Sequence, residues 1–257
     1  MLAAVAAATM VVDAGAAGAA GAAREASVAE ATGGRAAQAA PQAVIQPGAS
    51  ITMGGSYCTL NWIYDGTGPN AGRVFAGTAG HCVSGVGQDV ALAAGTSGDP
   101  ILTFGDVAYV DDDLDYAFIE VRPEHRGLVS PAMKGHPEFP TGVSTTGSAG
   151  AGDLIQFSGH GLGFHLLPLT QESRVGVLNY NDGTQHYVIG AVTPGDSGGP
   201  VGDITDGNRA LGIVNTLGVG AVEDALTVIT AGEGGVSLQG MLADAAADGF
   251  PVALRTV

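Results

Sequence analysis

Two stretches decide the fold: Thr78-Ala79-Gly80-His81-Cys82 and Gly195-Asp196-Ser197-Gly198-Gly199-Pro200. They supply an imidazole and a serine hydroxyl, and such a hydroxyl becomes a nucleophile when an imidazole within hydrogen-bond reach takes its proton. A carboxylate must hold that imidazole in the correct tautomer, and Asp115 lies between the two stretches. The chain therefore carries a base, a carboxylate and a nucleophile in the order His81, Asp115, Ser197.

Two other arrangements of these groups fit the sequence less well. The α/β-hydrolase elbow Gly-x-Ser-x-Gly, which residues 195–199 match, needs a histidine after the serine, but all six histidines precede Ser197. The subtilisin order needs an aspartate before His81. Asp65 is available there, but Asp65-Gly66 is typical of a hairpin turn. Asp113 is the alternative to Asp115, which we prefer because an apolar run typical of a buried strand, 116–119, follows it directly.

These residues resemble the chymotrypsin-like serine peptidases, and more narrowly the secreted bacterial branch that includes the streptogrisins and α-lytic protease. The match rests on segments 78–82, 115–119 and 194–201, and it spans roughly Cys58 to the C-terminus. The resemblance implies an all-β fold of two six-stranded antiparallel β-barrels with a C-terminal helix. It also implies a serine endopeptidase that works through an acyl-enzyme, with no cofactor and no metal.

The resemblance assigns further roles near the nucleophile. The backbone N–H groups of Gly195 and Ser197 would form the oxyanion hole, and Cys58 and Cys82 would form a disulfide beside the base. Closing that loop of about 24 residues would stabilise the fold by about 3 to 4 kcal/mol. The carboxylate of Asp196 would be buried behind the oxyanion hole and would need a cation. The candidate cations are Arg174, Arg209 and, more weakly, His160.

The resemblance also locates a specificity pocket. Its floor falls six residues before the nucleophile, at Ala191, and an uncharged floor opposes preference for Arg or Lys. We therefore expect an apolar or small side chain at P1, the substrate residue before the scissile bond. The pocket wall is expected at Asn215, Thr216 and Leu217.

Composition separates the N-terminus from the rest. Residues 1–43 are dominated by Ala and Gly, with two arginines and no aromatic residue, which is typical of a signal or propeptide segment that is disordered or removed. The whole chain has 9 Lys and Arg against 25 Asp and Glu, a net charge of −16, which opposes binding to nucleic acid or anionic membranes. We expect a secreted or cell-envelope monomer that acts on proteins or peptides and has no stable membrane insertion.

Short runs rich in β-branched and aromatic residues, separated about every 8 to 12 residues by Gly, Asp-Gly or Pro, predict a β protein. The expected strands are 59–64, 73–79, 101–110, 116–121, 154–158, 174–179, 187–192 and 210–214. Apolar residues recurring at three and four positions predict one helix over 238–247. A Pro- and Gly-rich linker, 131–147, is expected between a first barrel, 44–130, and a second barrel, 148–257.

Two other functions would use the same residues. One is a narrow-specificity esterase or processing enzyme, which a comparison of peptide and ester substrates distinguishes. The other is a secreted binding protein on the same fold that cleaves nothing. The latter requires Ser197 to be unreactive, for example because Asp196 lacks a cation and the oxyanion hole has collapsed.

Overall fold

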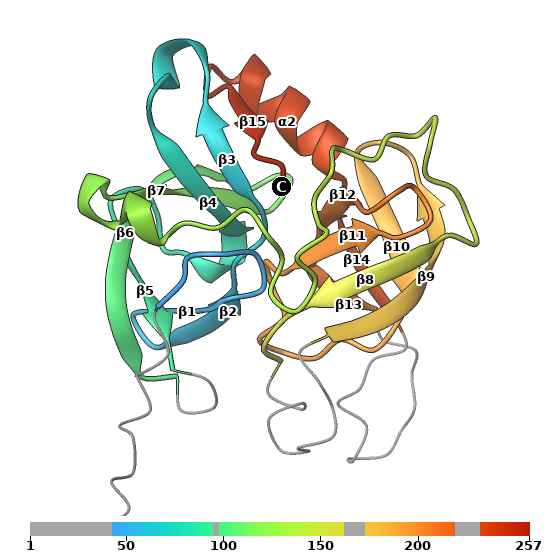
Figure 1. The fold of residues 1–257 in the computed structure, drawn as a ribbon, viewed down its shortest axis with the longest axis horizontal. Helices are drawn as coiled ribbons and strands as arrows, with labels where there is room; N and C mark the ends of the chain where they lie inside the picture. Colours follow the sequence, from blue (N-terminus) through green and yellow to red (C-terminus); the bar gives the residue numbers. More distant parts are fainter. Residues whose placement is uncertain (1–42, 95–97, 162–172, 219–231) are drawn as a thin grey trace, which may run out of the picture. The chain divides into compact units, whose positions relative to one another are not determined.

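The computed structural model describes residues 43–94, 98–161, 173–218 and 232–257. Apart from Ala43, the expected signal or propeptide segment, 1–43, lies outside the described residues. Residues Pro41–Val257 belong to one compact unit, which contains two antiparallel sheets. Figure 1 shows the first sheet mostly in blue to green and the second in yellow to red.

The first sheet has the strand order β15-β3-β4-β7-β6-β5-β1-β2. Its strands are β1 (Ser50–Met53), β2 (Ser56–Thr59), β3 (Ile63–Gly66), β4 (Val74–Ala79), β5 (Asp89–Ala93), β6 (Pro100–Asp111), β7 (Tyr116–Val121) and β15 (Val252–Leu254). Short 3-10 turns follow three of them: η1 (Gly68–Asn70), η2 (Gly80–Cys82) and η3 (Pro123–Leu128).

Strand β7 is covered on both faces, because its alternate side chains enter different clusters. Ile119 and Val121 join the core of the first barrel. Tyr116 and Phe118 point the other way and join a cluster that also holds Trp62 and side chains of the C-terminal helix. A strand buried on both faces is held rigidly, and β7 begins directly after Asp115.

The second sheet has the order β12-β11-β8-β9-β10-β14-β13. Its strands are β8 (Leu154–Ser158), β9 (Ser173–Asn181), β10 (Gln185–Ile189), β11 (Pro200–Asp203), β12 (Arg209–Ile213), β13 (Thr216–Gly218) and β14 (Gly232–Val236). Helix α2 (Leu238–Ala247) follows, and the chain then returns to the first sheet as β15, which pairs with β3. The indole Nε1 of Trp62 donates to the Gly212 carbonyl at 3.0 Å, so the two sheets are joined in their shared core.

The expected double-barrel architecture and the C-terminal helix over 238–247 are confirmed. The described strands number eight and seven instead of six per barrel, partly because β15 extends the first sheet. The expected strand 59–64 is divided between β2 and β3. At this break the Asn61 side chain makes local hydrogen bonds: its Oδ1 accepts the Trp62 N–H at 2.7 Å and the Tyr64 hydroxyl at 2.9 Å.

Candidate active site

His81 and Asp115 are brought together by the pairing of β4 with β7. Ala79 lies opposite Tyr116 in that pair, so the turn η2 after β4 meets the residue that precedes β7. Gly80 favours this close approach, because a Cβ there would make a tight contact of 3.1 Å with Asp115 Oδ1. Asp115 itself has a left-handed backbone, with φ of 58°, which turns its side chain toward His81.

The predicted disulfide is confirmed: Cys58 is bonded to Cys82, with a Cα–Cα distance of 6.3 Å. It ties the turn that carries His81 to strand β2. Since Cys82 follows His81 directly, the covalent link restrains the position of the imidazole.

Asp115 holds His81 through two kinds of hydrogen bond. The His81 backbone N–H donates to Asp115 Oδ1 at 2.6 Å, and His81 Nδ1 lies 2.8 Å from Oδ2. An Nδ1–H that donates to this carboxylate leaves Nε2 as the proton acceptor. The hydrogen bond that His81 donates to Asp115 is the main cause that raises the pKa of His81, while partial burial acts in the opposite direction.

Asn215, predicted in the pocket wall, is a hydrogen-bond partner of Asp115. It donates through Nδ2 to Asp115 Oδ2 at 3.0 Å and also to the Asp115 carbonyl. Its own Oδ1 accepts the Val236 N–H at 2.9 Å, which fixes the amide orientation. Partial burial acts to raise the pKa of Asp115, but the hydrogen bonds from His81 and Asn215 outweigh it, and the pKa is lowered.

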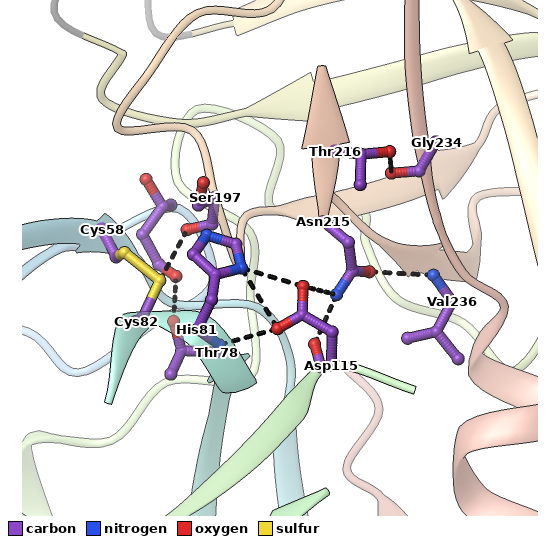
Figure 2. Close-up of polar contacts among 11 residues, drawn as sticks. Cys58, Thr78, His81, Cys82, Asp115, Ser197, Asn215, Thr216, Gly234 and Val236 are labelled. Atoms are coloured by element: carbon purple, nitrogen blue, oxygen red, sulfur yellow. Dashed lines mark hydrogen bonds and ion pairs between the residues drawn. A yellow bond between two sulfur atoms is a disulfide. The ribbon is translucent and has the colours of Figure 1, made fainter. Parts of the chain in front are cut away.

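Ser197 lies in a tight turn before β11, at the contact between the barrels. Its carbonyl accepts the Thr59 N–H at 2.9 Å, and the Gly198 N–H donates to the Val214 carbonyl at 2.7 Å. Gly198 has φ of 81°, and a Cβ there would come within 2.3 Å of Thr78 Oγ1, so only glycine fits. Figure 2 draws Ser197 and Asp115 on opposite sides of the His81 ring.

Arg174, on β9, is the cation that faces Asp196. Its two terminal nitrogens lie 2.5 and 2.7 Å from the two carboxylate oxygens, and both side chains are almost fully buried. The backbone N–H groups of Gly161 and Thr193 donate to the same carboxylate at 2.9 and 2.8 Å. A buried carboxylate is tolerated only when it is paired and hydrogen-bonded, and Asp196 meets both conditions.

The other two candidate cations lie elsewhere. The Arg209 side chain is 46% exposed and lies 4.0 Å from Asp206, and His160 Nε2 lies 2.9 Å from the Lys134 ammonium. Glycine at positions 159 and 161 leaves room for Asp196, since a Cβ at either would lie within 2.6 Å of a carboxylate oxygen.

The remaining predicted residues are placed as follows. Gly195 is buried and has φ of 103°. A Cβ on this residue would lie 3.1 Å from the His160 carbonyl oxygen. Ala191 is half-buried, and its carbonyl accepts Arg174 Nη1 at 3.1 Å. Thr216 and Leu217 lie on β13, where Leu217 pairs with Glu233. Asp113, the alternative carboxylate, is exposed and makes no hydrogen bond with His81.

Metal-ligating residues gather at two places among the described residues. At the first, Cys58 and Cys82 lie beside His81, but their sulfurs are bonded to each other. At the second, Asp111, Asp244 and Asp248 lie close together, and the hydroxyl of Tyr109 donates to Asp248 at 3.0 Å. Asp111 is the last residue of β6, Asp244 lies on α2, and Asp248 follows that helix directly. Within the described part of the chain, no helix is long and apolar enough to span a membrane.

No protein-family model and no curated protein matches the sequence. Solved structures do match. Thermobifida fusca Protease A is 20% identical, with 84% of this chain and 100% of that chain covered at a TM-score of 0.52. A glutamic acid specific serine protease is 20% identical (82% and 100% covered, TM-score 0.53), and alpha-lytic protease homolog N4 is 19% identical (82% and 100% covered, TM-score 0.53). The likeness shows that the chain has the chymotrypsin-like fold.

Proposed function

We propose that the protein is a secreted serine endopeptidase that hydrolyses peptide bonds through an acyl-enzyme. The observation that carries this proposal is the hydrogen-bonded pair of His81 and Asp115 beside Ser197. The chymotrypsin-like fold of the serine proteases named above and the Cys58–Cys82 disulfide, typical of an oxidising compartment, support it.

Each residue has a role in the proposed reaction. The hydroxyl of Ser197 attacks the scissile carbonyl while His81 Nε2 accepts its proton and later gives it to the leaving amine. Asp115, held by Asn215, keeps Nδ1 protonated and stabilises the imidazolium that forms. Water then attacks the acyl-enzyme, with His81 again acting as the base, and releases the second product.

The amides of Gly195 and Ser197 would hold the oxyanion. This role depends on the backbone between them, and Asp196 lies in the middle of that backbone. Because its carboxylate is fixed by Arg174 and by two backbone N–H groups, the turn is held from inside the second barrel. Loss of one oxyanion donor typically costs about 2.7 to 4 kcal/mol of transition-state stabilisation.

Substrate preference is proposed from Ala191. As the floor of the primary pocket it carries no charge, which favours an apolar or small P1 side chain over Arg or Lys. The enzyme is proposed to act as a monomer and to need neither a cofactor nor a metal, since the reaction uses only side-chain and backbone groups of this chain.

Labelling with a fluorophosphonate tests the proposal. Peptide-level mass spectrometry should find the label on Ser197 at a stoichiometry of about one, and the Ser197→Ala variant should not be labelled. The absence of labelling in a folded, disulfide-bonded protein would contradict an active peptidase and favour a latent zymogen or a binding protein. Labelling combined with cleavage of esters, but of no peptide, would favour an esterase.

A further inference from the structure

A cavity of about 420 Å³ lies beside the proposed catalytic pair. Asp115 and Asn215 form part of its wall, together with residues of β9, β10, β13 and β14. This volume lies within the range typical of sites that hold small molecules or side chains. The cavity is therefore adjacent to the proposed catalytic pair. Ala191, the proposed floor of the P1 pocket, is not among its lining residues, although Asn215 and Thr216 of the expected pocket wall are.

The residues that line the cavity favour the binding of a cationic group. The wall includes Asp113, an exposed residue with a carboxylate, and Tyr180 and Tyr187, which carry aromatic rings. No lysine or arginine lines the cavity in the part of the chain that the structure describes. The basic side chain His186 is fully buried there, and its Nε2 lies 3.1 Å from Glu233 Oε1. A carboxylate together with aromatic faces attracts an ammonium or a guanidinium group.

A peptide substrate can reach the cavity along the edge of the second sheet. Strand β13 stands last in that sheet and pairs with β14 alone among the described strands. An extended peptide can add to such an edge through its backbone, and its side chains then point alternately to the two faces of the sheet. Thr216, the first residue of β13, lies in the cavity wall, so one side chain of such a peptide would reach the cavity.

We propose that this cavity is a substrate subsite that selects a Lys or Arg side chain at a position other than P1, and that Asp113 determines this selection. The inference rests on the proposed peptidase function and deepens it. It separates two recognition tasks: the uncharged pocket at Ala191 takes the P1 side chain, and the acidic cavity takes a basic side chain of the same peptide.

The test compares matched peptide substrates. At each position other than P1, lysine is replaced by norleucine, which has a similar length and no charge, and kcat/KM is measured for both peptides. We expect the lysine peptide to be favoured by about 5- to 20-fold at one position, with the preference decreasing at high salt. Asp113→Asn should reduce that preference to about 2- to 3-fold.

Asp112→Asn is the matched control. It removes the same charge one residue away, and Asp112 is exposed but does not line the cavity. Asp112→Asn should keep the lysine preference. The comparison uses the ratio of kcat/KM for the two peptides. If Asp113→Asn disturbs Asp115, both peptides are cleaved more slowly by the same factor, and the ratio does not change.

Three outcomes would overturn the subsite: no lysine preference at any position, an equal loss in both variants, or a preference that Asp113→Asn leaves intact. If no peptide is cleaved, the proposed function fails, and the subsite is then tested by itself. The Kd values of the lysine and norleucine peptides are then measured with the Ser197→Ala protein, and their ratio replaces the ratio of kcat/KM values. Equal Kd values would refute the subsite.

Discussion

Replacing Arg174 with alanine tests the anchor behind the candidate oxyanion hole. Arg174 makes two charge-assisted hydrogen bonds to Asp196, at 2.5 and 2.7 Å. The exposed fractions of the two side chains are 8% and 1%, so water does not replace the lost partner without rearrangement. The variant leaves a buried carboxylate with backbone donors from Gly161 and Thr193 as its remaining main support.

The expected loss is large. Removing one partner of a buried ion pair typically lowers the free energy of unfolding by about 3 to 5 kcal/mol. Domains are usually stable by about 5 to 15 kcal/mol, so Arg174→Ala removes a substantial share. With a urea dependence of about 2 kcal/mol per molar, the unfolding midpoint should fall by roughly 1.5 to 2.5 M.

Urea unfolding and the rate of fluorophosphonate labelling provide the two readouts. Arg209→Ala is the control, because that side chain is 46% exposed and its nearest carboxylate lies at 4.0 Å; it should cost less than about 0.5 kcal/mol. The double variant Arg174→Leu with Asp196→Asn removes both charges and should be more stable than Arg174→Ala. Labelling should be slower in Arg174→Ala even under conditions where the variant is fully folded.

The reasoning would be refuted if Arg174→Ala lost no more stability than Arg209→Ala. It would also be refuted if the folded Arg174→Ala protein were labelled at the parent rate. The first result would mean that the ion pair adds nothing to stability, and the second that Asp196 does not position the oxyanion donors.

Three further predictions concern the base, a buried carboxylate and the disulfide. Asp115→Asn should lower kcat/KM by about 10³- to 10⁴-fold. Because His81 must be deprotonated to act and Asp115 raises its pKa, the acidic limb of the pH–rate profile should also move to lower pH. Burial raises the pKa of Asp203 to about 6. Ionisation of this carboxyl therefore lowers the free energy of unfolding as the pH rises from about 4 to 6, and the free energy stays lowered above pH 6. Asp203→Asn should therefore stabilise the protein by about 1 to 3 kcal/mol in urea unfolding at pH 7.5 and not at pH 4, and an equal gain at both values would contradict this cause. Replacing Cys58 and Cys82 with serine should lower the free energy of unfolding by about 3 kcal/mol, measured against the oxidised parent, and an unchanged midpoint would exclude the loop-closure effect.

Elements with strong local patterns were predictable from the sequence. Strands β7 and β8 and helix α2 have the predicted bounds, because β-branched and aromatic runs or a helical spacing specify them locally. Strand β14 was missed, since its sequence Gly-Glu-Gly-Gly-Val has the composition of a loop. Its glycines are required by packing: a Cβ at Gly235 would lie 1.8 Å from the Ile213 carbonyl, and only the folded structure shows that approach.

The candidate site was predictable where one short motif carries several roles, and not where distant residues meet. His81, Asp115 and Ser197 lie in motifs that specify their chemistry. The contact of Asn215 with Asp115 joins residues 100 positions apart, so no local pattern could reveal it. The choice of Arg174 over Arg209 likewise depends on which side chain enters the interior of the second barrel.

Strand β15 affects the order in which the protein can be built. Residues 252–254 pair with β3, about 190 positions earlier in the chain, and Arg255 forms an ion pair with Asp65 beside them. The ribosome therefore releases all of the second barrel before the first sheet can receive its outermost strand. Contacts between such distant segments slow folding, because a long loop must close before they form. The first sheet is consequently expected to be completed only after the second barrel has been synthesised.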